Sequence, residues 1–365
     1  MYHCSLSKAS SETWLTISSS TDRLMSQHHD GCPVHIKVSN IVPAYNAAAT
    51  IPAAIASLQA QTMRDWEAIV VDDASTDATP EVLRRISFGD PRIRIVRNVV
   101  NLGPGGSRNV GLRMAHGDWV ALLDADDHFH SARLATLLAL AEQADADMVA
   151  DNLVLYDETT ARTQLLFDKS EFRTARFMPF QEFIASSWGE GAPRRSGYVF
   201  MHPVVRRTFL ECHELSYDPL VRNGEDFLFY LDCLAAGARW LVTPEAMYSY
   251  CIHDGSMADV VRNRDRAAMI RKLRELIQRP GIAENAPVAD ALESHMRLVA
   301  YTHYSYAVKH AVTKGQVRNL FIAMSIHPSA ALPALTELRR RMPDICRRAV
   351  RRVARAQSKP GRTLR

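Results

Sequence analysis

The stretch Trp66-Glu-Ala-Ile-Val-Val-Asp-Asp-Ala-Ser-Thr-Asp77 decides the fold class. Its first six residues are mainly apolar, as is typical of a parallel strand that is covered on both faces of a sheet. The residues that follow end the strand, and Ser75, Thr76 or Asp77 can cap a helix expected over 78–86. The stretch therefore predicts a buried strand that leads directly into a helix.

The same unit recurs along the chain on both sides of this stretch. Strands are expected over 34–42, 93–97, 119–123 and 148–155, and helices over 53–61, 109–115 and 132–144. This alternation predicts an α/β fold with a doubly wound, mostly parallel sheet. The pattern after residue 259 is helical, so C-terminal helices are expected to follow the sheet.

Polar residues follow three of the expected strands. They are Pro43 to Asn46, the pair Asp72 and Asp73, and the run Asp124-Ala-Asp-Asp127. Ligands of doubly wound sheets bind beyond the carboxyl ends of the strands. One crevice can therefore collect all three segments.

The run Asp124-Ala-Asp-Asp127 raises a charge problem, because burying like charges together is unfavourable without a positive partner. Asp124 and Asp126 point the same way if the strand continues. Oxygen ligands at that spacing suit Mg²⁺ or Mn²⁺ bridging to phosphate oxygens. A solvated strand end would show the same pattern, so the run alone leaves both interpretations open.

The glycine-rich segment Gly103-Pro-Gly-Gly106 is a weaker signal. It does not complete the dinucleotide pattern G-x-G-x-x-G, because position 108 is Arg, and no G-K-[ST] follows as a phosphate loop requires. A tight turn between strand and helix is the simpler interpretation. Arg108 directly after the turn is nevertheless placed to reach a diphosphate.

Composition restricts the class of protein. The chain has 365 residues, 47% of them hydrophobic, which is enough for a large core. Its six cysteines are scattered without a CxxC pair, which favours a reducing cytoplasm over a zinc site or a disulfide framework. No apolar run is long enough to span a membrane, and no apolar signal core follows the N-terminus.

Positive charge is concentrated in the tail. Residues 337–365 hold 11 Lys and Arg against 2 acids, whereas residues 1–336 hold 33 against 38. Arginines recur at helical spacing over 344–356, which suits an anionic membrane surface, although a solvated helix has the same pattern. Nucleic acid is not an expected partner, because the tail lacks interleaved aromatic residues and the body is acidic.

Five motifs together carry a family resemblance. They are Val42-Pro-Ala-Tyr-Asn46, Val70-Val-Asp-Asp-Ala-Ser-Thr-Asp77, Asn101-Leu-Gly-Pro-Gly-Gly-Ser-Arg-Asn-Val-Gly111, Leu123-Asp-Ala-Asp-Asp127 and Gly224-Glu-Asp226. In this order and spacing they resemble the family 2 glycosyltransferases with the GT-A fold, over residues 34–258. Within that family the likeness is greatest to bacterial glucosyltransferases of succinoglycan-type exopolysaccharide assembly.

The resemblance implies roles for single residues around the nucleotide-sugar. Tyr45 is expected against the uracil base and Asp73 at uracil N3, and Asp126 matches the metal-binding carboxylate. The other residues implied in nucleotide-sugar binding are Pro43, Ala44, Asn46, Arg108, Asp124, Ala125 and Asp127, of which Asp124 is also implied as a metal ligand. Asp226 matches the catalytic base, with Glu225 beside it.

Two interpretations are open for His253. The resemblance allows it to donate to the diphosphate or to complete the metal shell, but an ordinary surface histidine is equally compatible with its position. Trp188 is similarly open between stacking on an acceptor sugar and packing.

The resemblance also implies a domain organisation. A disordered leader is expected over 1–33, the GT-A domain over 34–258, a helical region over 259–336 and a basic tail over 337–365.

The implied activity is the inverting, Mn²⁺- or Mg²⁺-dependent transfer of a hexose, glucose in this subgroup, from a UDP-sugar to a saccharide. The acceptor in the subgroup is linked to polyprenyl diphosphate at the cytoplasmic face of the inner membrane, where the basic tail would make a peripheral contact. Two alternatives are a non-catalytic nucleotide-sugar-binding subunit and a sugar-1-phosphate nucleotidyltransferase. The latter needs a glycine-rich loop after the first strand, where this chain has Pro43 to Asn46.

Overall fold

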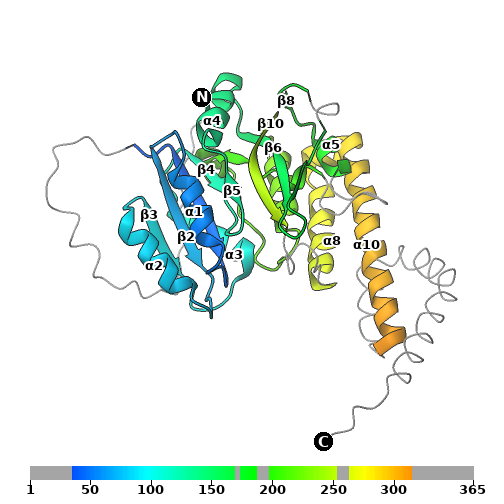
Figure 1. Ribbon diagram of the computed structural model, residues 1–365. Helices are drawn as coiled ribbons and strands as arrows, with labels where there is room; N and C mark the ends of the chain where they lie inside the picture. The colour runs from blue at the N-terminus through cyan, green and yellow to red at the C-terminus, as the bar shows by residue number, and fades with distance from the viewer. Residues whose placement is uncertain (1–34, 169–172, 187–196, 253–262, 315–365) are drawn as a thin grey trace, which may run out of the picture.

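A computed structural model describes residues 35–168, 173–186, 197–252 and 263–314 (Figure 1). The strands are β1 Val38–Ala44, β2 Trp66–Asp72, β3 Ile93–Arg97, β4 Trp119–Leu122, β5 His128–Phe129, β6 Met148–Asp157, β7 Arg162–Leu165, β8 Arg176–Phe177, β9 Val204–Arg206 and β10 Trp240–Ile252. The helices are α1 Ile51–Gln59, α2 Thr79–Gly89, α3 Gly103–Met114, α4 Arg133–Ala144, α5 Phe180–Ser186, α6 Arg207–Cys212, α7 Glu225–Ala235, α8 Asn263–Ile277, α9 Pro280–Ala283 and α10 Ala286–Lys314, with a 3₁₀ turn η1 over Tyr198–Phe200.

One mixed sheet organises the molecule. Its strand order is β3-β2-β1-β4-β9-β6-β10-β5, with β7 paired to β6 and β8 to β10. The pairs β1–β2, β2–β3, β1–β4 and β6–β10 are parallel, whereas β9 is antiparallel to both of its neighbours. The predicted mostly parallel α/β sheet is confirmed. The sequence did not reveal β9, because a three-residue strand carries too little periodicity.

Helices cover both faces of the sheet, as the doubly wound prediction requires. Side chains of α1, α2 and α4 pack on one face in a single hydrophobic cluster. Side chains of α5, α7, α8 and α10 form the larger cluster on the other face, while Val110 of α3 packs there on Ile69 and Val71 of β2. Figure 1 shows α8 and α10 side by side beyond the β6–β10 side of the sheet.

Residues 157–200 contain more structure than their weak periodicity predicts. The described parts form β7, β8, α5 and η1. The sequence pattern near Trp240 predicts only a short strand, but β10 has 13 residues and pairs with β6 through two register shifts. β7 and β8 have four and two residues that are mostly exposed or partly exposed, and the burial of β10 does not alternate strictly, so none of the three has the periodicity by which a strand is recognised in a sequence.

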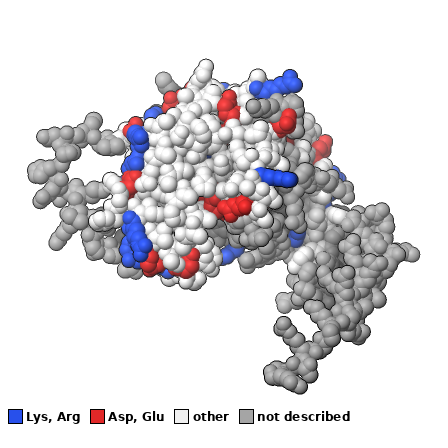
Figure 2. Space-filling model, in the orientation of Figure 1, with Lys and Arg blue, Asp and Glu red and all other residues white. Residues whose placement is uncertain are grey.

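One face of the described body can be inspected for charge in Figure 2. On the face in Figure 2, a group of acidic side chains lies near the centre, surrounded mainly by uncharged side chains, with basic ones scattered at the edges. None of the described helices is long and apolar enough to cross a membrane.

Candidate active site

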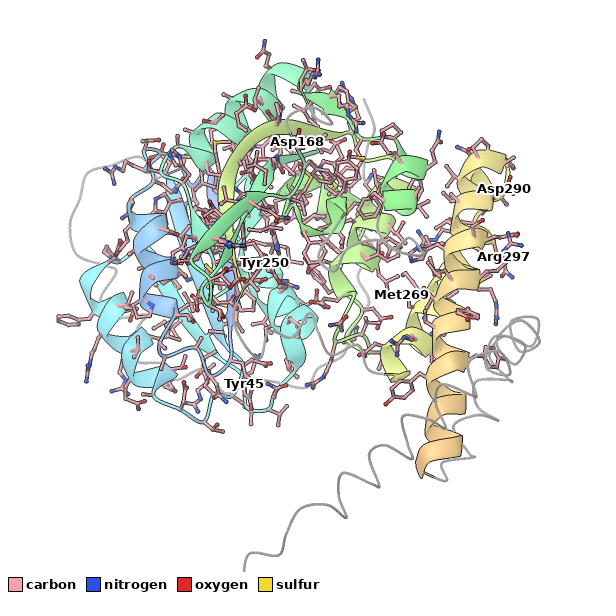
Figure 3. All side chains as sticks on the ribbon, turned by 45° about the vertical axis from the view of Figure 1, so that its right-hand side comes forward. Tyr45, Asp168, Tyr250, Met269, Asp290 and Arg297 are labelled. Atoms are coloured by element: carbon pink, nitrogen blue, oxygen red, sulfur yellow. The ribbon has the colours of Figure 1, made fainter. Side chains whose placement is uncertain are left out.

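The loops after β1 and β2 are joined by hydrogen bonds at the carboxyl edge of the sheet. The backbone N–H of Asn46 donates to Oγ of Ser75 at 3.0 Å, and the N–H of Thr76 donates to Oδ1 of Asn46 at 2.8 Å. The predicted side-chain N-cap of α2 is wrong in detail, because the N-cap residue is Ala78 and makes no such bond, although Asp77 just before it accepts from the N–H of Thr79 at 3.0 Å. Tyr45 lies at this lower edge in Figure 3 and is 51% exposed, so its ring offers a flat surface to a planar base.

Asp73 is built into the start of α3. Its Oδ1 accepts from the backbone N–H of Leu102 and from Nδ2 of Asn98, both at 2.8 Å, and its Oδ2 accepts from the N–H of Gly103 at 2.8 Å. Free N–H groups at a helix N-terminus need such partners. A carboxylate has about four acceptor positions, so a further donor, such as a pyrimidine N–H, can still bind to Oδ2.

The buried residue Arg108 lies between three acids, of which Glu225 is buried and Asp124 and Asp226 are partly exposed. The residue is 2% exposed, and its Nη2 donates to Oδ1 of Asp124 at 2.8 Å. Its Nη1 donates to Oε1 of Glu225 at 2.8 Å and lies 3.0 Å from Oδ1 of Asp226. We call Arg108, Asp124, Glu225 and Asp226 the reaction cluster. The positive charge that the acids require is therefore supplied in part by the protein itself.

The acids of the reaction cluster differ in their protonation. Burial and the neighbouring charge of Asp226 raise the pKa of Glu225 to about 8, although Arg108 acts in the opposite direction. Burial also favours the neutral form of Asp124, but Arg108 and His202 outweigh it and lower the pKa. Near neutral pH, Asp124 is ionised while Glu225 is largely protonated, so the cluster holds fewer negative charges than its composition suggests.

Asp127 is fixed by β10. The hydroxyl of Tyr248 donates to Oδ2 at 2.7 Å, and the backbone N–H of Cys251 donates to Oδ1 at 2.8 Å. Burial, together with the charges of Asp126 and Asp124, raises the pKa of Asp127 well above its ordinary value. A cation placed among these carboxylates would offset that repulsion.

A histidine that had no assigned role faces the same carboxylates. Donor atoms of His202, Asp124 and Asp127 all lie within 4.8 Å of one another. Burial lowers the pKa of His202, which favours the neutral imidazole that binds metals. Two carboxylate oxygens and one imidazole nitrogen form a donor set that fits a divalent cation such as Mn²⁺. The residues present therefore fit the metal that the sequence predicts.

A buried ion pair supports this part of the site. Nε of Arg133 donates to Oδ1 of Asp151 at 2.9 Å, and Oδ2 of Asp151 accepts from the backbone N–H of Met247 at 2.9 Å. Nη2 of Arg133 donates to the carbonyl oxygen of His202 at 2.9 Å. The pair thus ties α4, β6 and β10 to the segment that carries His202.

The structure brings most of the predicted residues to one edge of the sheet. Asp124, Arg108, Glu225 and Asp226 are in direct contact, and Asp126 is half-buried beside them in sequence. Pro43 and Ala44 end β1, and Ala125 is buried after β4. His253, Trp188 and the basic tail lie outside the described residues. The sequence assigned no role to His202, Tyr248, Arg133 or Asp151, although the segments 151–153, 197–203 and 248–250 loosely resemble the same family subgroup.

The chain matches a known family model. Residues 39–201 match the model described as glycosyl transferase family 2. The succinoglycan biosynthesis protein ExoU of Rhizobium meliloti is 31% identical over 81% of this chain and 84% of its own length. ExoO of the same organism is 38% identical over 64% of this chain and 66% of its own length. An Escherichia coli protein, UDP-Glc:alpha-D-GlcNAc-diphosphoundecaprenol beta-1,3-glucosyltransferase WfaP, is 23% identical over 77% of this chain and 98% of its own length.

Solved structures share the fold. Staphylococcus aureus TarS 1–349 in complex with UDP-GlcNAc superposes with a TM-score of 0.64 at 20% identity, covering 81% of this chain and 82% of TarS 1–349. The mannosyltransferase PcManGT of Pyrobaculum calidifontis, in complex with GDP-Man and Mn²⁺, gives a TM-score of 0.52 at 20% identity, covering 86% of this chain and 92% of PcManGT. With its GT-A-like sheet and its extended match to ExoU, the chain belongs to glycosyl transferase family 2, an inverting hexosyltransferase family.

Proposed function

We propose that this chain is a metal-dependent enzyme that transfers glucose from UDP-glucose to a lipid-linked saccharide in exopolysaccharide biosynthesis. The family membership supports glycosyl transfer, and the relatives ExoO and ExoU support the exopolysaccharide context. The donor and the acceptor follow the printed activity of WfaP, which uses UDP-Glc and a diphosphoundecaprenol-linked sugar.

The observation that carries the proposal is the reaction cluster. One guanidinium, that of Arg108, contacts Asp124 at the end of β4 and both acids at the start of α7. Inverting transfer needs a leaving group on one face of the anomeric carbon and a proton acceptor on the other. In our assignment, Asp124 belongs to the leaving-group side and Asp226 to the acceptor side, and Arg108 keeps the two sides at a fixed separation.

The donor binds along the carboxyl edge of the sheet in this proposal. Tyr45 stacks on uracil, Asp73 accepts from uracil N3, and Asn46 shapes the loop between them. Pro43, Ala44 and Ala125 provide backbone walls, and Asp127 contacts the ribose or the donor sugar. Arg108 acts on the diphosphate through Asp124 rather than by direct contact, because its guanidinium is already bonded to carboxylates.

The proton acceptor in this proposal is Asp226. Its side chain is 18% exposed, whereas that of Glu225 is 9% exposed and Glu225 is largely protonated near neutral pH. Asp226 is therefore the acid of the pair that is better placed to reach an acceptor hydroxyl and remove its proton. Glu225 fixes Arg108 and so acts as a positioning residue.

Asp126 and Asp124 would hold Mn²⁺ or Mg²⁺ beside the diphosphate, and His253 is the third residue that the sequence proposes for this role. When bound, the cation supplies positive charge that stabilises the departing UDP. The basic tail, 337–365, would place the enzyme at the cytoplasmic face of the inner membrane, close to a lipid-linked acceptor.

The test measures UDP release by the purified full-length chain with each UDP-sugar, with and without Mn²⁺ or Mg²⁺, followed by trials with lipid-linked acceptors. We expect UDP-glucose to be the preferred donor and EDTA to abolish release. Activity that survives both EDTA and Asp226→Asn would contradict the mechanism. Tight UDP binding without turnover on any acceptor would indicate the non-catalytic alternative.

A further inference from the structure

His202 has an unusual backbone conformation. Its φ is +42°, in the left-handed region that side-chain-bearing residues rarely adopt, and the residue is only 3% exposed. Such a conformation costs about 1–3 kcal/mol and persists only where the surroundings enforce it. Here Arg133 enforces it by donating to the carbonyl oxygen of His202 at 2.9 Å, while Arg133 is itself fixed by Asp151. The contacts around His202 therefore hold its imidazole in one orientation despite the cost of the backbone conformation.

The imidazole is oriented against the residue that holds Asp127. The ring of His202 stacks on that of Tyr248 with a centroid distance of 4.8 Å and an interplanar angle of 11°, and Tyr248 donates to Asp127. Nε2 of His202 lies 4.0 Å from Oδ2 of Asp124, which is too long for a hydrogen bond. Nδ1 is buried and has no hydrogen-bond partner within the described part of the chain. A buried polar nitrogen in that state calls for a partner such as a water or an ion, and neither imidazole nitrogen is held by a hydrogen bond to a described residue that would prevent ligation.

The geometry of the three side chains suits an ion better than a direct contact. Donor atoms of Asp124, Asp127 and His202 lie within 4.8 Å of one another. Ligands at about 2.0–2.2 Å from one ion lie at most about 4.4 Å apart. Side-chain shifts of a few tenths of an ångström are therefore enough to place all three around one cation. The buried, oriented histidine is an observation independent of the acidic run.

We propose that His202 is a nitrogen ligand of the divalent cation, together with Asp124 and Asp127, and that this ligand makes the site select Mn²⁺ over Mg²⁺. Imidazole suits first-row transition metals, whereas Mg²⁺ is bound by oxygen ligands and water. The inference rests on the proposed function, because it concerns the cation that accompanies the UDP-sugar. It also replaces His253 by His202 as the histidine of the metal site, and it assigns Asp127 to the cation, beside Asp124 and Asp126, rather than to the sugar.

The test detects nitrogen coordination directly. Full-length protein with UDP and Mn²⁺ is examined by pulsed electron paramagnetic resonance, in which a directly bound nitrogen modulates the spin echo of the ion. We expect wild-type protein to give an imidazole nitrogen signal that changes on ¹⁵N-histidine labelling. His202→Gln should lose the signal, whereas His253→Gln and His128→Gln, which replaces a histidine next to Asp127, should retain it.

A second measurement follows the selectivity. Titration calorimetry of UDP in the presence of Mn²⁺ or Mg²⁺ should show tighter binding with Mn²⁺ in the wild type, and His202→Gln should reduce that preference by about tenfold, the change that corresponds to about 1.4 kcal/mol. The wild-type echo does not depend on any variant folding, so a wild-type complex without a nitrogen signal overturns the inference by itself. A signal lost in His253→Gln and kept in His202→Gln also overturns it. Failure to bind UDP with either metal would instead overturn the proposed function, and the inference with it.

Discussion

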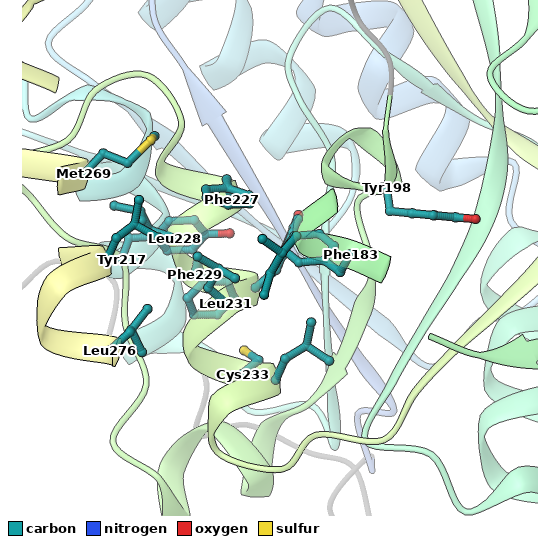
Figure 4. Packing of buried hydrophobic residues seen from close by; sticks show 14 of the residues in the cluster. Phe183, Tyr198, Tyr217, Phe227, Leu228, Phe229, Leu231, Cys233, Met269 and Leu276 are labelled. Carbon is teal, nitrogen blue, oxygen red and sulfur yellow. The ribbon is translucent and has the colours of Figure 1, made fainter. Parts of the chain in front are cut away.

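Two parts of α7 differ in the side chains that they carry. We call Glu225 and Asp226 the charged end, and the remainder of the helix from Phe227 the apolar end. The N-terminal end presents Glu225 and Asp226 to the guanidinium of Arg108. From Phe227, which is completely buried, to Leu234, every residue except Asp232 belongs to the apolar cluster that also includes side chains of α5, α8 and α10 (Figure 4). The comparison teaches that the packing of the apolar end fixes the position of the helix, and that this position places the two acids of the charged end beside Arg108. Substitutions at the two ends should therefore have separable effects.

The largest effect is expected at the charged end. Asp226→Asn removes the proposed proton acceptor and should lower kcat by about 10²- to 10⁴-fold, with little change in UDP affinity or thermal midpoint. The matched control is Asp232→Asn on the same helix, whose carboxylate pairs with Lys272 at 2.9 Å and Arg279 at 3.2 Å away from the site. Steady-state kinetics with a lipid-linked acceptor measure both variants. An equal loss of kcat in Asp226→Asn and Asp232→Asn would show that the charged end has no special role in the reaction.

The neighbouring residue should give the opposite result. Phe227 stacks on Phe183 with a centroid distance of 5.6 Å, so Phe227→Ala leaves a cavity and should lower the free energy of unfolding by about 3–5 kcal/mol. The UDP affinity of the protein that remains folded should be unchanged. Phe88→Ala is the control, because Phe88 is almost fully exposed. Urea denaturation and UDP calorimetry check the two quantities, and a selective loss of UDP affinity would count against the comparison.

The apolar end should also respond to pH. Burial lowers the pKa of His295, whose ring lies 4.6 Å from that of Phe227, from 6.5 to about 4. Between these values the unfolded state binds more protons, so stability is full above pH 6.5 and falls as the pH drops towards 4, by at most about 3 kcal/mol. His295→Phe should flatten this dependence in urea denaturation at pH 4 to 7. The exposed His130→Phe variant should keep the wild-type slope, and an unchanged slope in His295→Phe would contradict the assignment.

The smallest effect is expected from alanine substitution of the two glycines that flank α7. It distinguishes the effect of backbone strain on stability from the effect of a displaced Asp226 on activity. Gly224 and Gly237 flank α7 with φ values of +84° and +92°, so alanine at either should cost about 1–2 kcal/mol of stability. Only Gly224→Ala should also lower kcat, because relief of the backbone strain at Gly224 moves the nearby Asp226, whereas the added Cβ meets only the flexible end of Met269, at 2.6 Å. Denaturation and kinetics of both variants test this. Equal kcat values in Gly224→Ala and Gly237→Ala would show that a shift of Asp226 does not affect the reaction.

The sequence predicted where several residues of the candidate site lie in the fold, whereas their roles stay predictions. Tyr45, Asp73 and Asp124 each follow an apolar strand directly, and a strand end fixes the edge of the sheet at which a residue lies. The strands that precede these residues, β1, β2 and β4, could be predicted because their buried residues form mainly apolar runs. The family resemblance added Glu225 and Asp226, whose pattern alone is compatible with an ordinary helix start.

The contacts within the site were not predictable in the same way. Arg108 was expected at the diphosphate, but its guanidinium contacts Asp124 and Glu225, which lie 16 and 117 residues away in sequence. The orientation of His202 depends on a positive φ and on a bond from Arg133, and neither leaves a periodic signal. Contacts of this kind depend on how distant segments pack, which spacing along the chain does not encode.

The shared guanidinium of Arg108 has an evolutionary consequence. Because it contacts three acids at once, the loss of Arg108 by a single mutation would remove a shared partner from all of them, and the loss of one partner from a buried ion pair is strongly destabilising. Loss of Asp226 alone removes only one partner, so the arginine can outlast the activity. Descendants of this enzyme that have become inactive should therefore retain Arg108, and a lineage that replaces it should show compensating changes at Asp124 and Glu225.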